Sequence, residues 1–142
     1  MEILRDNLAR GASFSLVGIA LLVIGFVALD LVTPGKLRNQ VWIERNRNAV
    51  ILTASMVVGL ALVLIAAVID TAYLELWRGL VYSIAYVVLA IAVMMWSFVL
   101  IDWLTPGKLG TVLLENDEHP AGWITAAVFV GIGATIAATI LA

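Results

Sequence analysis

Charged residues fall in short clusters along this chain, and long apolar stretches without charge separate the clusters. The stretches cover 11–29, 48–69, 79–101 and 119–142, with the single histidine counted as neutral. A helix needs about 20 mostly apolar residues to cross the hydrocarbon core of a bilayer, because each residue adds about 1.5 Å. Every stretch reaches about that length. The pattern therefore predicts an all-α integral membrane protein with four transmembrane helices.

Composition supports the same class of protein. Hydrophobic residues make up 63% of the chain and charged residues 13%, with a mean hydropathy of +1.10. Soluble proteins have about 45–50% hydrophobic residues and about 25% charged residues. A lipid bilayer accommodates this much apolar surface, since lipid replaces water around the outer face. We expect one membrane domain over residues 1–142. The net charge of −2, without any basic stripe, argues against nucleic acid as a partner.

The chain also resembles itself at an offset of 72 residues, the distance from Asp30 to Asp102. The motif D-x-x-T-P-G-K-L begins at each of these two residues. Hydrophobic composition alone does not easily produce such a motif twice in register, so we expect a duplication, with repeat one over about 12–70 and repeat two over about 84–142. The other motif residues are Thr33, Pro34, Gly35 and Lys36 in the first copy and Thr105, Pro106, Gly107 and Lys108 in the second.

Each repeat holds two spanning helices, so both copies enter the membrane from the same side. We expect two tandem parallel repeats, related by a pseudo-twofold axis along the membrane normal. Both T-P-G-K motifs then lie at one membrane face, which we call the loop face. The positive-inside rule predicts a cytoplasmic loop face with both termini outside. The basic residues are Lys36, Arg38, Arg45, Arg47 and Lys108 at the loop face, and Arg5, Arg10 and Arg78 at the other.

Each Thr-Pro pair predicts the start of a short helix, because threonine is a good N-cap and proline suits the first helical position. In the first copy Leu37, Val41 and Trp42 form an apolar stripe with charges behind it, which is typical of a helix in the headgroup plane. A polar loop with a few buried anchors is the alternative. We expect Asn48 to cap the spanning helix that follows.

Asp30 and Asp102 are the candidate functional residues, because each is a carboxylate at the end of a long apolar helix. An anion is unfavourable in the membrane and at the C-terminal end of a helix, so each carboxylate needs a partner. In a structural interpretation it accepts hydrogen bonds from the motif threonine or from N–H groups of the next helix, or pairs with Lys36 or Lys108. In a functional interpretation the two carboxylates face each other as a proton or cation site. Plain solvent exposure is the third alternative.

The second helix of each repeat carries small residues at close spacing, which allow helix backbones to approach each other in lipid. Such residues serve either packing within the bundle or contact between subunits, and the sequence leaves both alternatives open. The residues are Ser55, Gly59, Gly131, Gly133 and Ala137.

The sequence offers no recognisable catalytic or cofactor-binding set. It has no cysteine and one histidine, His119, which disfavours a metal site or a Ser-His-Asp triad. Gly35-Lys36 lacks the upstream glycine and the following serine or threonine of a phosphate-binding loop. We therefore expect no enzyme, no metal and no cofactor.

The repeated motif, each copy between two apolar helices, resembles one family of bacterial inner-membrane proteins, the domain of unknown function 350 family, also called YjfL-like. The resemblance covers about residues 12–142 and rests on the Asp, Thr, Pro and Gly of both motifs. It implies a duplicated four-helix protein of the inner membrane, with a hint of a role in envelope stress, and it implies no site residue. The second loop departs from the first, with Glu115, Asp117 and Glu118 in place of Ile43, Arg45 and Asn46.

Two functions fit the sequence. The first is a non-enzymatic membrane subunit that forms an oligomer or holds a partner membrane protein, which the small size and the small-residue helix faces favour. The alternative is a small ion channel or a proton- or cation-linked transporter that uses Asp30 and Asp102. Transport would require an oligomer, because four helices rarely enclose a pathway alone.

Overall fold

The computed structural model describes residues 1–33, 37–104 and 120–142, and these residues are helical almost throughout. Four helices in this part of the chain are long and apolar enough to cross a membrane, which confirms the predicted class. A short helix follows the first T-P-G-K motif, whereas the one expected after the second motif falls outside the described residues. The helices are α1 (Glu2–Val32), α2 (Leu37–Trp42), α3 (Arg47–Asp70), α4 (Leu76–Leu104) and α6 (Ala121–Leu141).

Helix α1 is longer than its apolar stretch. The apolar stretch begins at residue 11, but the helix begins at Glu2, because residues 2–12 contain no proline and the acidic Glu2 suits the positive end of the helix dipole. A change from apolar to charged residues marks the membrane boundary and does not end a helix. With 31 residues α1 is about 46 Å long, against about 30 Å of hydrocarbon, so its first turns extend beyond the bilayer core.

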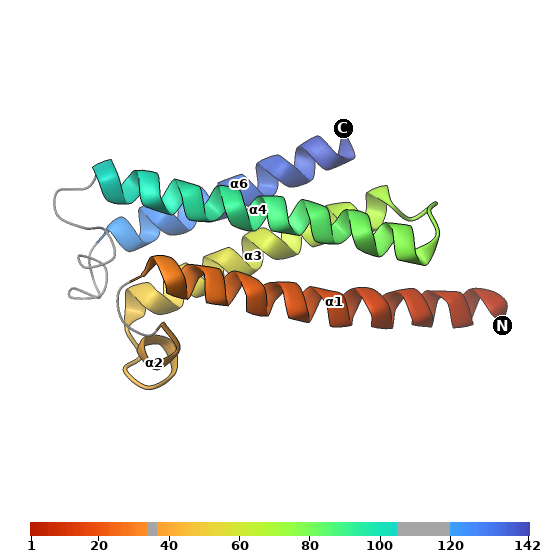
Figure 1. Ribbon diagram of the computed structural model, residues 1–142, viewed down its shortest axis with the longest axis horizontal. Coiled ribbons are helices and arrows are strands. Elements are labelled where there is room, and N and C mark those ends of the chain that lie inside the picture. The colour runs from red at the N-terminus through yellow and green to blue at the C-terminus, as the bar shows by residue number, and fades with distance from the viewer. Residues whose placement is uncertain (34–36, 105–119) are drawn as a thin grey trace.

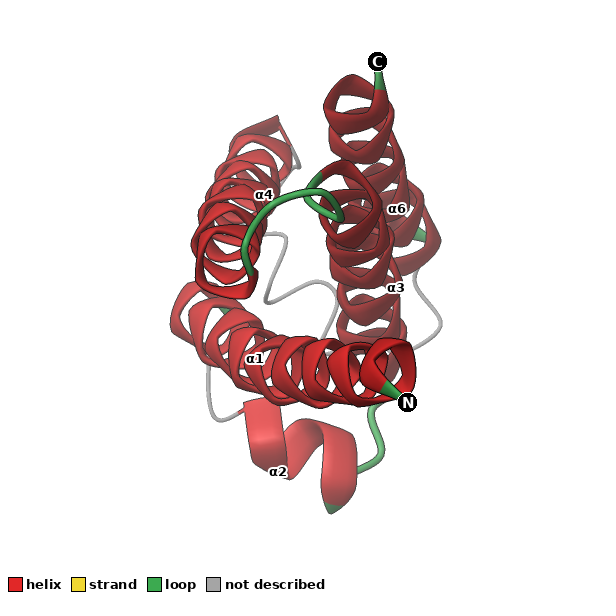
Figure 2. Cartoon of the chain, turned by 90° about the vertical axis from the view of Figure 1, so that its right-hand side faces the viewer, coloured by secondary structure: helices red, strands yellow, loops and turns green. Residues whose placement is uncertain are grey.

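The long helices alternate in direction, as Figure 1 shows. Helices α1 and α4 run one way and α3 and α6 run the other, so both termini lie at one end of the bundle. The ends of α1 and α4 and the beginnings of α3 and α6 lie at the opposite end, the loop face. The short α2 lies there too, outside the four long helices and beside α1 (Figure 2).

Helix α3 is the centre of the bundle. In its most apolar window 44% of the residues are buried, against 22–28% in the other three spanning helices, and it contacts α1, α2, α4 and α6. A twofold axis that exchanges the repeats would make the pair α3 and α4 equivalent to α6 and α1. Within the described residues α1 and α6 form no comparable contact. The predicted pseudo-twofold symmetry therefore does not extend to the packing of the helices.

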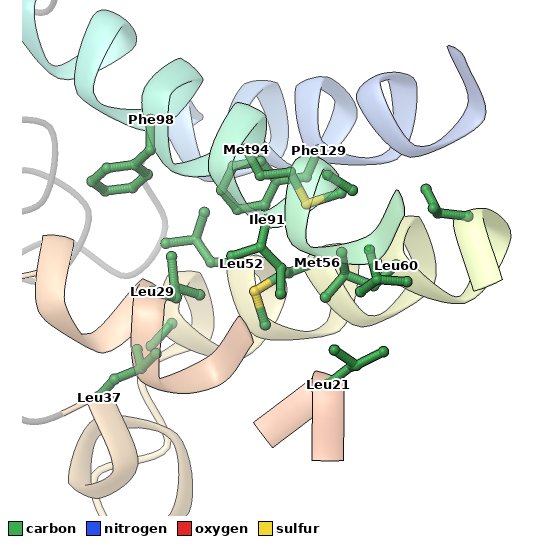
Figure 3. Close-up of a cluster of buried hydrophobic side chains, with 14 residues drawn as sticks. Leu21, Leu29, Leu37, Leu52, Met56, Leu60, Ile91, Met94, Phe98 and Phe129 are labelled. Atoms are coloured by element: carbon green, nitrogen blue, oxygen red, sulfur yellow. The ribbon is translucent and has the colours of Figure 1, made fainter. Parts of the chain in front are cut away.

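The interior is filled by large apolar side chains from all four long helices (Figure 3). Leu37 anchors α2 to the same cluster and is fully buried. Dense packing of this kind matters in a membrane, because lipid is as apolar as the core and close contact replaces the hydrophobic effect as the main source of stability. The central side chains are Leu29 of α1, Leu52, Met56 and Leu60 of α3, Met94 and Phe98 of α4, and Phe129 of α6.

Polar groups fix both ends of α3. At its start the Asn46 side chain accepts a hydrogen bond of 3.0 Å from the Ala49 N–H, so Asn46 is the N-cap and the prediction of Asn48 was wrong. Asn48 instead lies inside the first turn, buried against Gly122 of α6. The reason is that helix α3 begins at Arg47, the last residue of the charged cluster and one residue before the apolar stretch.

At the other end of α3 a basic side chain from α1 completes the cap. The Arg10 guanidinium donates hydrogen bonds to the carbonyl oxygens of Thr71 (3.3 Å) and Leu74 (3.2 Å), and it lies 5.7 Å from the centre of the Phe14 ring. A cation is favourable at the negative end of a helix dipole. Arg10 therefore ties the beginning of α1 to the connection between α3 and α4.

Candidate functional site

Asp30 lies half-buried in the last turn of α1 and connects α1 to α2. Its Oδ1 atom accepts a hydrogen bond of 2.6 Å from the Leu37 N–H, at the first residue of α2. The Thr33 hydroxyl donates instead to the backbone carbonyl oxygens of Leu29 (3.1 Å) and Asp30 (3.3 Å). The carboxylate thus satisfies an N–H group at the positive end of a helix, where an anion is favourable. The threonine closes the end of α1, and α2 begins at Leu37, so the prediction that Thr33 caps the following helix was wrong.

We expect Asp30→Ala to release α2 from the bundle. A helix of six residues is not stable alone, and loss of a capping carboxylate costs about 1–2 kcal/mol. Hydrogen exchange of the amides in 37–42 should accelerate about tenfold in lipid nanodiscs.

Asp30→Asn is the matched variant, because the amide oxygen can still accept the bond from Leu37. Exchange in this variant should stay within about threefold of the original protein. Equal acceleration in both variants would mean that the negative charge, and not the hydrogen bond, holds α2.

Asp102 occupies the corresponding position in the last turn of α4 and is also half-buried. Because α1 and α4 run in the same direction, the structure brings Asp30 and Asp102 to the same end of the bundle (Figure 1). The motif residues 34–36 and 105–108 lie outside the described residues. Among the described residues no group of three or more His, Cys, Asp or Glu side chains is placed to hold a metal ion.

Helices α3 and α6 approach each other backbone to backbone at two glycines. A Cβ atom added to Gly133 would lie 2.5 Å from the Gly59 Cα atom, and one added to Gly59 would lie 2.8 Å from the Phe129 carbonyl oxygen. Real Cβ atoms do not come so near to backbone. Only glycine therefore fits at these two positions, and they pack inside the bundle.

The remaining small residues do not share this contact. Ser55 is buried and its hydroxyl donates to the Leu52 carbonyl oxygen at 2.9 Å, while Ala137 is half-buried. Gly131 is exposed, and a Cβ atom added to it would meet no atom within 4 Å. Gly131 therefore does not belong to the packing inside the bundle, although Gly59 is its counterpart in the repeat.

Threonines at matched positions of the two repeats make the same hydrogen bond. The Thr53 hydroxyl donates to the Ala49 carbonyl oxygen at 2.9 Å, and the Thr125 hydroxyl to that of Ala121 at 2.8 Å. Both hydroxyl groups thus find an acceptor within their own helix, as a polar side chain in a membrane protein must.

The chain also matches a known protein family. The sequence profile of a family described as Domain of Unknown Function (DUF350) matches residues 3–140. The chain belongs to the DUF350 family. The four spanning helices among its described residues make it a multi-pass membrane protein. No solved structure matches the chain.

Curated relatives of this DUF350 protein carry equally general names. A "UPF0719 transmembrane protein" of Mycolicibacterium paratuberculosis is 34% identical over 124 residues, which cover 87% of this chain and 82% of the relative. UPF0719 transmembrane proteins of Mycobacterium bovis and Mycobacterium tuberculosis are each 36% identical over 127 residues, covering 89% of this chain and 83% of theirs.

Two polar groups of this DUF350 protein have roles that the sequence pattern did not predict. Arg10 serves in the sequence as a marker of topology, whereas in the structure its side chain caps α3. Asn46 directly precedes the first charged residue of α3 and is a favoured N-cap type, so its place at the edge of the apolar stretch is a signal for a cap. No such local signal marks the partner of Arg10, because that partner depends on how α1 packs.

Proposed function

We propose that this protein is a non-enzymatic subunit of a bacterial inner membrane that associates with a second copy of itself through the outer face of α6. The observation that carries the proposal is the open space at Gly131, where an added Cβ atom would meet nothing within 4 Å. Ala127 and Thr135 lie one turn before and after it and are also exposed. A row of small residues that faces lipid is the usual contact surface of associating membrane helices.

The surface around Gly131 is also hollowed. A groove of about 400 Å³ lies between α4 and α6 and includes Leu89, Val93 and Ile132 beside Gly131. The Thr135 hydroxyl donates to the Gly131 carbonyl oxygen at 2.7 Å, so the face offers no unsatisfied polar group to lipid or to a partner helix. A helix of a second copy could therefore approach closely without burying a lone polar atom.

The filled interior favours a non-enzymatic membrane subunit over an ion channel or transporter. Met56, Met94 and Phe129 occupy the middle of the bundle and are fully buried, and the Asp30 carboxylate is engaged with α2 at one end. A pathway for ions needs polar groups or water along its length.

We infer that the loop face is cytoplasmic, from its excess of basic residues.

Gly131→Leu should disrupt the association. The leucine side chain would separate the two helices, and we expect the dissociation constant of the dimer in liposomes to rise at least tenfold, which corresponds to about 1.4 kcal/mol. Energy transfer between labelled copies, measured over a range of protein-to-lipid ratios, gives this constant.

Gly11→Leu is the matched control, because an added Cβ at Gly11 of α1 also meets no atom within 4 Å. This variant should associate like the original protein. Equal loss in both variants, or a monomer at every protein-to-lipid ratio, would contradict the proposal.

Proton flux in the same liposomes should be absent in the original protein and in the variants Asp30→Asn and Asp102→Asn. Flux that depends on either residue would favour transport.

A further inference from the structure

An apolar groove of about 300 Å³ runs between α1 and α3 on the outside of the bundle. Ile19 and Phe26 line it from α1, Thr53 and Val57 line it from α3, and Trp42 lines it from the end of α2. The Thr53 hydroxyl is satisfied by the Ala49 carbonyl oxygen. The walls therefore present hydrocarbon to an occupant and suit an alkyl chain.

The groove has the depth of one leaflet of a bilayer. Phe26 and Ile19 stand six and thirteen residues before the end of α1, or about 9 and 20 Å from the loop face at a rise of about 1.5 Å per residue. Thr53 and Val57 lie about 9 and 15 Å from the start of α3. Half of the hydrocarbon core measures about 15 Å. An occupant of the groove would thus lie parallel to the acyl chains of the leaflet at the loop face.

Three exposed arginines stand where the groove reaches the loop face. Arg38 belongs to α2, Arg45 to the connection between α2 and α3, and Arg47 is the first residue of α3. In the described part of the chain no carboxylate lies within ion-pairing distance of any of them. The exposed Glu44 is the one acidic residue of that connection, so the local charge stays positive.

Two of these arginines occupy unfavourable positions. Arg47 places a cation in the first turn of α3, at the positive end of the helix dipole. Arg45 has a φ angle of 53°, in the left-handed region that residues other than glycine rarely adopt. A bound anion would offset the repulsion at Arg47, since N–H groups at a helix start and arginine side chains both favour phosphate.

We propose that this surface binds one anionic phospholipid, with an acyl chain in the groove between α1 and α3 and the phosphate near Arg38, Arg45 and Arg47. A free phosphate would leave the groove unused, and an apolar helix of another protein would leave the arginines without an anion. A phospholipid matches both parts, as basic pockets beside membrane helices do in lipid recognition. Trp42, which is 72% exposed, is suited to the level between headgroup and acyl chain.

Native mass spectrometry in mild detergent tests the headgroup part, with phosphatidylglycerol and phosphatidylcholine of equal chain length as probes. We expect tighter binding of phosphatidylglycerol. In the triple variant Arg38→Gln, Arg45→Gln, Arg47→Gln its dissociation constant should rise at least tenfold, because each basic residue contributes to attraction of an anionic lipid. Arg5→Gln with Arg78→Gln, at the opposite end of the bundle, should leave the constant unchanged.

Filling the groove tests the acyl-chain part. Val57→Trp should raise the dissociation constant of phosphatidylglycerol at least fivefold, whereas Val58→Trp should not, because Val58 is the next residue and lines a different groove between α3 and α6. Circular dichroism and thermal unfolding establish that each variant is folded. A variant that unfolds is replaced by Val57→Phe or Val58→Phe.

Several outcomes would overturn the proposal. They are equal affinity for the two lipids, equal loss in the distal arginine variant, equal loss for Val57→Trp and Val58→Trp, and full displacement of phosphatidylglycerol by inorganic phosphate, which would indicate a site for a free anion. Gly131→Leu should bind the lipid like the original protein, because α6 lies on another surface. A failure of self-association would therefore leave this inference standing.

Discussion

Replacement of Gly133 by leucine should destabilise the folded bundle by about 3 kcal/mol, because the new side chain has no space between α3 and α6. The nearest atoms are backbone atoms of Gly59, which cannot move aside as a side chain can. The two helices would have to separate, and the separation would also reduce contacts of the neighbouring Phe129. Reversible unfolding of the detergent-solubilised protein in increasing dodecyl sulfate measures the change.

Gly131→Leu is the control for this prediction, two residues away on the same helix. Leucine has a higher helix propensity than glycine by about 0.8 kcal/mol, and nothing at this position opposes the larger side chain. We expect unchanged or slightly increased stability, measured at a dilution where the protein is monomeric. Destabilisation of the two variants to the same degree would refute the assignment of Gly133 to the interior and Gly131 to the surface.

Phe129→Ala should cost about 2 kcal/mol. In a soluble protein a buried phenylalanine replaced by alanine costs about 3–5 kcal/mol, part of which is the transfer of apolar surface from water. That part nearly disappears in a membrane, because the unfolded helix is surrounded by lipid and not by water. The loss of packing in the cavity remains, since Phe129 is fully buried.

Trp96→Ala provides the comparison for Phe129→Ala, since Trp96 is large and aromatic but 66% exposed on the outside of α4. Its removal should change the unfolding free energy by less than about 0.5 kcal/mol. The same unfolding experiment applies. Similar losses at both positions would mean that aromatic residues contribute mainly through lipid and not through the core.

The sequence contained enough information for the class of protein, and it left a short list of alternatives for the partner of Asp30. A membrane helix needs a long apolar stretch, and the length of each uncharged stretch can be counted in the sequence. These lengths predicted the four spans found in the described residues. A carboxylate at a helix end needs a donor, and an N–H group of the following helix was one of the predicted donors. Both predictions follow from local chemistry, in which the interacting residues are near each other in the chain.

The packing of the helices could not be predicted in the same way. In a soluble helix a polar face shows which side is exposed, but both sides of a membrane helix are apolar. Nothing in the sequence therefore distinguishes the buried Gly59 from the exposed Gly131, although they match in the repeat. The hydrogen bonds of Arg10 could not be predicted for a related reason, because they join residues more than 60 positions apart.

The contact between Gly59 and Gly133 bears on how far the two halves of the chain can still replace each other. A shift of 72 residues turns this pair into Gly131 and Ala61, so the sequence provides only one copy of the contact. In a homodimer every interface residue appears twice, and a favourable change on one side is imposed on the other. Covalent linkage removes that constraint. The two halves can then diverge, one to hold the bundle together and the other to present its glycine outward.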